Sequence, residues 1–180
     1  MSRYLSALRR NFDELQRAKM ARLCARGFES NWPPTHLHAK LYYNALSNDY
    51  LTRCMKVFER RSQTASFWYL ERSNAATMLS ALDGDKDRLQ ELRAVSERLK
   101  HIRDKVHLHI DEVGVLDQER VWQDAALSSE RLDRAVNVAL AALHRLVEQQ
   151  NLTVELIPTD LTLFHSTRVA TYLNGMSPRE

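Results

Sequence analysis

The sequence predicts an all-α protein that folds as an antiparallel bundle of four to six helices. Two observations lead to this prediction. Gly and Pro number only four each among 180 residues, a composition that favours long regular elements. Apolar residues also recur three and four positions apart, which is the spacing of one helix face. Long helices joined by short links pack as antiparallel bundles.

The apolar spacing and the Gly and Pro positions define the expected helices of the first half. A basic helix over 2–27 carries one apolar stripe, which consists of Leu5, Leu8, Phe12 and Leu15. A second helix begins at the expected N-cap Thr35 and reaches about Arg60. A shorter helix covers about 66–82, and the next one starts near Asp85, after an Asp-Gly-Asp turn.

The second half is expected to contain a loop, two helices and one extended piece. In chain order these are a loop over 115–128 with a helical turn around Trp122, a helix from the cap Ser128 or Ser129 to about Gln150, an extended segment over 152–157 and a last helix over 161–173.

The composition predicts a soluble, cytoplasmic protein that forms a single domain over 1–180. No run of eighteen apolar residues is present, so no transmembrane helix and no membrane partner are expected. Cys24 and Cys54 lack metal-ligand spacing and are too few for a disulfide scaffold, so we expect both to be reduced. The sequence also lacks a Gly-rich phosphate loop, a Cys-x-x-Cys pair and a His-Glu-x-x-His metal helix.

Positive charge is concentrated in two stretches of the chain. Residues 1–26 carry seven Lys and Arg side chains against Asp13 and Glu14, and residues 86–105 carry seven against four acidic ones. Basic surfaces of this kind attract phosphate backbones. Solvated helix faces are the alternative interpretation, because charge runs usually have that role.

The segment from His101 to Glu112 holds most of the residues that can carry chemistry. His107 and Asp111 lie one helical turn apart, but two ligands without a nearby third make a weak metal site, so we expect neither metal nor cofactor. A salt-bridged helix end is a structural alternative. The third interpretation is phosphate chemistry without a metal, because Arg offers a planar fork for phosphate oxygens and His exchanges protons near neutral pH.

The run LKHIRDKVHLHIDE resembles the signature helix of the HEPN superfamily, in which four to six residues separate an Arg from a His. The similarity is closest to the abortive-infection branch of that superfamily, and the earlier segment SFWYLER is similar to a stretch of the same branch. Arg103 matches the Arg of the motif, His109 the His and Asp104 the polar residue after the Arg. The resemblance covers about 35–150, with the basic helix before it and an extension over 152–180.

The resemblance implies a homodimer in which two Arg–His pairs face one cleft and cleave RNA without a metal. It further implies a toxin or phage-defence effector, with an antitoxin or another regulatory protein as a partner. His109 would be the general acid or base, Arg103 would stabilise charge on the phosphate, and Asp104 would orient one of these two. The expected RNA-binding residues are Lys100, Lys105 and His107.

Two alternatives remain open at the level of sequence. Ideal helix geometry places His107 beside Arg103, four residues away, whereas the resemblance selects His109. A non-catalytic helical module, which dimerises, binds a nucleotide or RNA, or docks on a partner, is the alternative to the enzyme.

Overall fold

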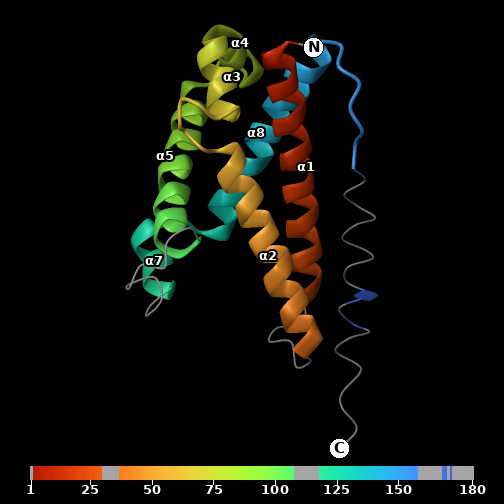
Figure 1. Ribbon diagram of the computed structural model, residues 1–180, viewed down its shortest axis with the longest axis vertical. Coiled ribbons are helices and arrows are strands. Elements are labelled where there is room, and N and C mark those ends of the chain that lie inside the picture. Colours follow the sequence, from red (N-terminus) through yellow and green to blue (C-terminus); the bar gives the residue numbers. More distant parts are fainter. Residues whose placement is uncertain (1, 30–36, 108–117, 158–167, 170, 172–180) are drawn as a thin grey trace, which may run out of the picture. The chain divides into compact units, whose positions relative to one another are not determined.

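The helical prediction is confirmed in the part of the chain that the structure describes. The computed structural model describes residues 2–29, 37–107, 118–157, 168, 169 and 171 (Figure 1). Within these ranges the chain forms seven α-helices and one π-helical turn, and it contains no strand. The helices belong to two compact units, one made of Met1–Asp13 and Cys54–Val154 and the other of Glu14–Arg53 and Glu155–Glu180.

The unit of Glu14–Arg53 and Glu155–Glu180 is built on a pair of helices. It contains most of α1 (Arg3–Glu29) and of α2 (Leu37–Val57), which run antiparallel (Figure 1). Phe28 and Ala39 are buried between them, and the ring of Phe28 stacks on Tyr42 with centroids 6.5 Å apart. The side-chain amide of Gln16 in α1 holds the segment 155–157, because it donates to the carbonyl of Glu155 and accepts from the Ile157 N–H.

The other unit contains the remaining helices, packed around α5 and α8. In chain order they are α3 (Phe67–Ser73), α4 (Ala75–Ala81), α5 (Lys86–Ile102), the π-turn η1 (Arg103–His107), α7 (Gln118–Ala125) and α8 (Ser129–Gln149). Helices α5 and α8 run antiparallel, with α3 and α4 near the start of α5 and α7 near its end (Figure 1). Arg131 of α8 donates two hydrogen bonds, of 2.5 and 2.7 Å, to Glu91 of α5 and thereby holds the pKa of Glu91 below its ordinary value.

An aromatic cluster fixes the link between α2 and α3 against α5. Phe58, Phe67 and Trp68 are almost fully buried. The Trp68 Nε1–H donates to the carbonyl of Phe58 at 3.1 Å and to the hydroxyl of Ser96 at 3.0 Å. Because a buried indole N–H needs an acceptor, these two bonds hold the link at a defined place beside α5.

The structure differs from the sequence prediction at three places. The helix expected over 66–82 is two helices, because Asn74 leaves helical geometry and its side chain accepts the Thr77 N–H as the N-cap of α4. The expected loop over 115–128 contains the α-helix α7, so the number of α-helices exceeds six. Residues 152–157 form neither a helix nor a strand. Thr35 and most of the last expected helix lie outside the described residues.

Helix α5 starts beside Asp85, as the sequence predicts, and Asp85 is its N-cap. The side chain of Asp85 accepts the backbone N–H groups of Asp87 and Arg88, at 2.9 and 3.0 Å. The turn before it needs positive φ angles at Asp83 and at Gly84, which glycine adopts without strain. Ser128 caps α8 in the same way, by accepting the Arg131 N–H at 3.2 Å.

Replacing Asp85 with alanine should lower the free energy of unfolding by about 1 kcal/mol, because two N–H groups at the start of α5 lose their acceptor. Urea unfolding followed by circular dichroism measures this change. Asp124→Ala is the matched control, since Asp124 is 59% exposed and lies inside α7 rather than at a helix start. A loss in the control as large as in Asp85→Ala would show that the cap has no special contribution.

No described helix combines the length and the apolar character that crossing a membrane requires.

Candidate functional site

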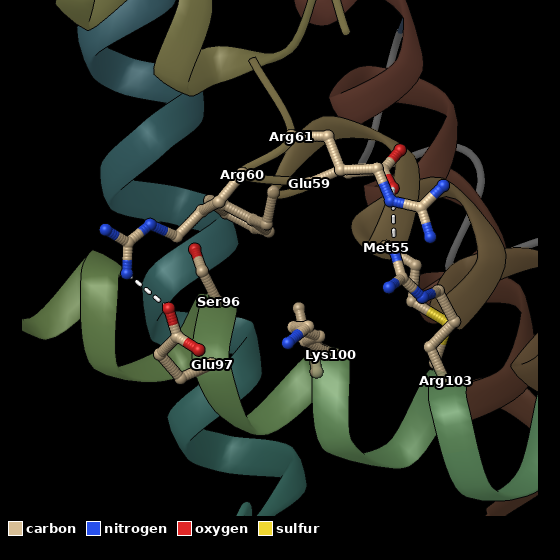
Figure 2. A pocket seen from close by; sticks show the side chains of 10 residues that line it. Met55, Glu59, Arg60, Arg61, Ser96, Glu97, Lys100 and Arg103 are labelled. Atoms are coloured by element: carbon tan, nitrogen blue, oxygen red, sulfur yellow. Dashed lines mark hydrogen bonds and ion pairs between the residues drawn. The ribbon is translucent and has the colours of Figure 1, made fainter. Parts of the chain in front are cut away.

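The unit that contains α5 has a cavity of about 320 Å³ between α5 and the segment that follows α2. Figure 2 shows the side chains along this cavity, with Ser96, Glu97, Lys100 and Arg103 following one another on α5 and η1. Buried apolar residues form one wall, and charged residues surround the rest. The lining consists of Met55, Phe58, Glu59, Arg60, Arg61, Ser96, Glu97, Leu99, Lys100 and Arg103.

Arg103 stands where α5 changes from α-helical to π-helical geometry. Its own backbone is helical and its N–H still bonds to the carbonyls of Leu99 and Lys100, but residues 103–107 form a π-turn. A π-turn is wider than an α-turn and often marks a functional site. The helix end therefore widens after Arg103, so the ideal α-helical spacing expected between Arg103 and His107 does not hold there.

The guanidinium of Arg103 is buried and held by two carboxylates. Only 8% of the residue is exposed. Its Nε and Nη2 atoms donate to one oxygen of Asp104, at 2.9 and 2.7 Å, and Nη1 donates to Glu59 at 2.7 Å. Asp104 and Glu59 thus fix the plane of the guanidinium from two sides. A buried charge requires such partners, because an unpaired one is strongly destabilising.

Within the part of the chain that the structure describes, two N–H groups of Arg103 remain for another acceptor. Arginine has five N–H donors, and three of them make the bonds to Asp104 and Glu59. The other Nη1 hydrogen and the other Nη2 hydrogen make no hydrogen bond to a described residue. Paired Nη donors of this kind match two oxygens of a phosphate group.

Arg61 shares the carboxylate that holds Arg103. The same Glu59 oxygen lies 3.2 Å from Nε of Arg61 and 2.7 Å from Nη1 of Arg103 (Figure 2). Arg61 is 69% exposed, whereas Arg103 is buried. Glu59 therefore joins a fixed cation inside the cavity to an exposed cation at its edge.

A second ion pair lies at the other end of the cavity. Arg60 donates to Glu97, and both side chains are about half exposed (Figure 2). The Arg60 guanidinium also lies over the ring of Trp68, with its central carbon 5.8 Å from the ring centroid. Together these contacts place a donor and an acceptor side by side at the cavity mouth.

The cavity has an excess of positive charge. Four cationic side chains line it against two carboxylates, which leaves a net charge of +2. Asp104, although it is not part of the lining, neutralises part of the charge of Arg103. The arrangement is suited to an anion that also offers hydrogen-bond donors or an apolar face.

The structure brings together some of the predicted site residues. Arg103 and Lys100 line the same cavity, and Asp104 contacts Arg103 directly. Lys105 lies on η1, and the cavity lining does not include it. His109 lies outside the described residues, as does the side chain of His107. The described residues hold no group of three or more candidate metal ligands.

Sequence reasoning missed four charged residues of this cavity, namely Glu59, Arg60, Arg61 and Glu97. Glu59, Arg60 and Arg61 precede α3 by several positions and lie 35 or more residues before Ser96, the first cavity residue of α5. The only signal in the sequence is the charged run Glu-Arg-Arg directly after the apolar end of α2. Such a run is usually a solvated surface, so it gave no reason to select these residues.

No protein-family model, curated protein or solved structure matches this chain.

Proposed function

We propose that the protein is a metal-independent endoribonuclease that acts as a homodimer and serves as a toxin or phage-defence effector. The observation that supports this proposal best is the position of Arg103 in a basic cavity, fixed by Glu59 and Asp104. Its contacts with the described residues leave two N–H groups for a phosphate. The resemblance of the segment around Arg103 to the HEPN signature supplies the class of reaction.

The reaction requires few protein groups, because RNA carries its own nucleophile. The 2′-hydroxyl oxygen attacks the adjacent phosphorus, the bond to the 5′-oxygen breaks, and a 2′,3′-cyclic phosphate forms. His109 accepts the proton of the 2′-hydroxyl and then donates it to the leaving 5′-oxygen. Arg103 stabilises the negative charge that develops on the phosphate oxygens.

The other charged residues hold the RNA strand. Lys100 lies between the two ion pairs of the cavity and attracts the phosphate backbone, as do the exposed Arg60 and Arg61. Asp104 is a positioning residue in this scheme, because it fixes the guanidinium of Arg103. Lys105 and His107 are further RNA-binding candidates from the sequence.

Purified protein should cleave RNA in excess chelator and leave 2′,3′-cyclic phosphate ends, because the nucleophile and the proton carrier do not depend on a metal. Gel analysis of the fragments, with an assay of their 3′ ends, measures this. DNA and RNA with a 2′-deoxy residue at the cleavage site are the controls and should stay intact. Cleavage that needs added magnesium would contradict this mechanism.

A non-catalytic RNA- or nucleotide-binding module is the second candidate, and the burial of Arg103 favours it. In that case the ion pairs of Arg103 with Glu59 and Asp104 hold the end of α5 to the α2–α3 link and have no part in chemistry. The protein then binds RNA without shortening it. RNA binding measured beside cleavage, on the same preparation, separates the two candidates.

A further inference from the structure

The ion pair between Arg60 and Glu97 is easily opened by a ligand. The two side chains are 46% and 55% exposed, and exposed ion pairs contribute little to stability. A molecule that offers an acceptor to Arg60 and donors to Glu97 can therefore replace this contact without loss of hydrogen bonds. The pair differs in this respect from Arg103 and Glu59, which are largely buried.

The surroundings of this ion pair are suited to a flat, partly apolar molecule. Met55, Phe58 and Leu99 form an apolar wall of the cavity. The ring of Trp68 supports the guanidinium of Arg60, which limits its movement. Nucleobases combine a flat apolar face with a polar edge, and proteins bind unpaired RNA bases through both.

The distance along α5 allows one nucleotide to reach both ends of the cavity. Glu97 and Arg103 are six residues apart, which corresponds to about 9 Å along a helix axis. Lys100 lies between them on the same side of the cavity (Figure 2). The hydrogen-bonding edge of a base at Glu97 and its 3′-phosphate at Arg103 are separated by the base ring and the ribose, which together span a distance of this order.

We propose that the Arg60–Glu97 end of the cavity is a binding site for a guanine base of the RNA substrate. This inference rests on the proposed function for the class of ligand. Guanine presents two neighbouring N–H donors beside a carbonyl oxygen. The two donors fit both carboxylate oxygens of Glu97, and the carbonyl oxygen accepts from Arg60. Cytosine can donate to only one carboxylate oxygen of Glu97, and its smaller ring covers less of the apolar wall.

Nucleotide binding to the full chain tests the proposal without requiring cleavage. Guanosine 3′-monophosphate should bind at least about tenfold more tightly than the adenosine, cytidine and uridine monophosphates, because hydrogen bonds to charged groups are the strong ones. Calorimetric titration measures the four dissociation constants. Equal affinities, or tightest binding of the cytidine nucleotide, would overturn the guanine site.

Glu97→Gln should lower the preference for guanine by about tenfold. The amide NH2 of glutamine is a donor, so it would face one of the two guanine N–H donors without an acceptor between them. Glu71→Gln is the matched control, since Glu71 pairs with Arg93, which also lies over Trp68, and Glu71 is not part of the cavity. We expect the control to change guanosine nucleotide binding less than about twofold. A preference for guanine that survives Glu97→Gln would overturn the assignment to Glu97.

The two proposals fail in different ways. RNA cleavage without any preference for guanine, together with equal nucleotide affinities, would remove the base site and leave the ribonuclease. Selective binding of the guanosine nucleotide by a protein that leaves RNA intact would remove the ribonuclease and keep the base site.

Discussion

Arg103→Lys should lower RNA cleavage by about 100-fold or more, the scale expected when a group that stabilises transition-state charge is lost. The structure explains why lysine cannot substitute. Arg103 reaches Asp104 through Nε and Nη2 and reaches Glu59 through Nη1, and its contacts with the described residues leave two N–H groups for the phosphate. An ammonium group carries three donors at a single point, so it cannot hold both carboxylates and a phosphate in the same geometry.

Arg61→Lys is the matched control for this change. Arg61 contacts the same oxygen of Glu59, but it is exposed, so lysine there keeps the charge at the edge of the cavity. We expect cleavage to fall less than about threefold in the control. Thermal unfolding of both variants must accompany the assay, because Arg103 also contributes to packing. Near-normal cleavage by a folded Arg103→Lys protein would mean that Arg103 supplies positive charge only.

His109→Ala should also lower cleavage by about 100-fold or more, the scale of losing a general acid or base, whereas His107→Ala should cost less than about tenfold. On an ideal α-helix His109 is about 120° around from Arg103, and His107 is closer. The π-turn over Arg103–His107 departs from that ideal geometry, so α-helical spacing does not decide between the two histidines. A phosphate held between two protomers would remove the same-face requirement altogether.

His101→Ala is the control for the histidine pair, since His101 is exposed on the last turn of α5 and does not line the cavity. Mixing the Arg103→Lys and His109→Ala proteins tests the shared site, because one site of a mixed dimer then has an intact Arg103 and an intact His109. Recovered cleavage is expected on mixing. If His107→Ala proves more damaging than His109→Ala, the site moves to His107 and the resemblance to the HEPN motif is superficial.

The helical architecture could be predicted because it depends on local information. Apolar spacing of three and four residues marks the buried face of each helix, and Asp85 and Ser128 act as caps through atoms two or three residues away. The same spacing predicts one helix over about 66–82 and misses the break at Asn74. Its side chain instead accepts the Thr77 N–H and starts a new helix, because asparagine is a good cap and a weaker helix former.

The sequence by itself determined the helices and the excess of basic residues, and it identified the segment around Arg103 as the candidate site. Only the tertiary structure decided what Arg103 contacts away from its own helix. Glu59 lies 44 residues earlier in the chain and Arg60 lies 37 residues before its partner Glu97, and no periodic pattern connects such positions. The packing of Trp68 between the carbonyl of Phe58 and the hydroxyl of Ser96 brings the α2–α3 link to α5. That packing creates the cavity, because hydrogen bonds of a buried indole select one position for a segment whose own sequence specifies none.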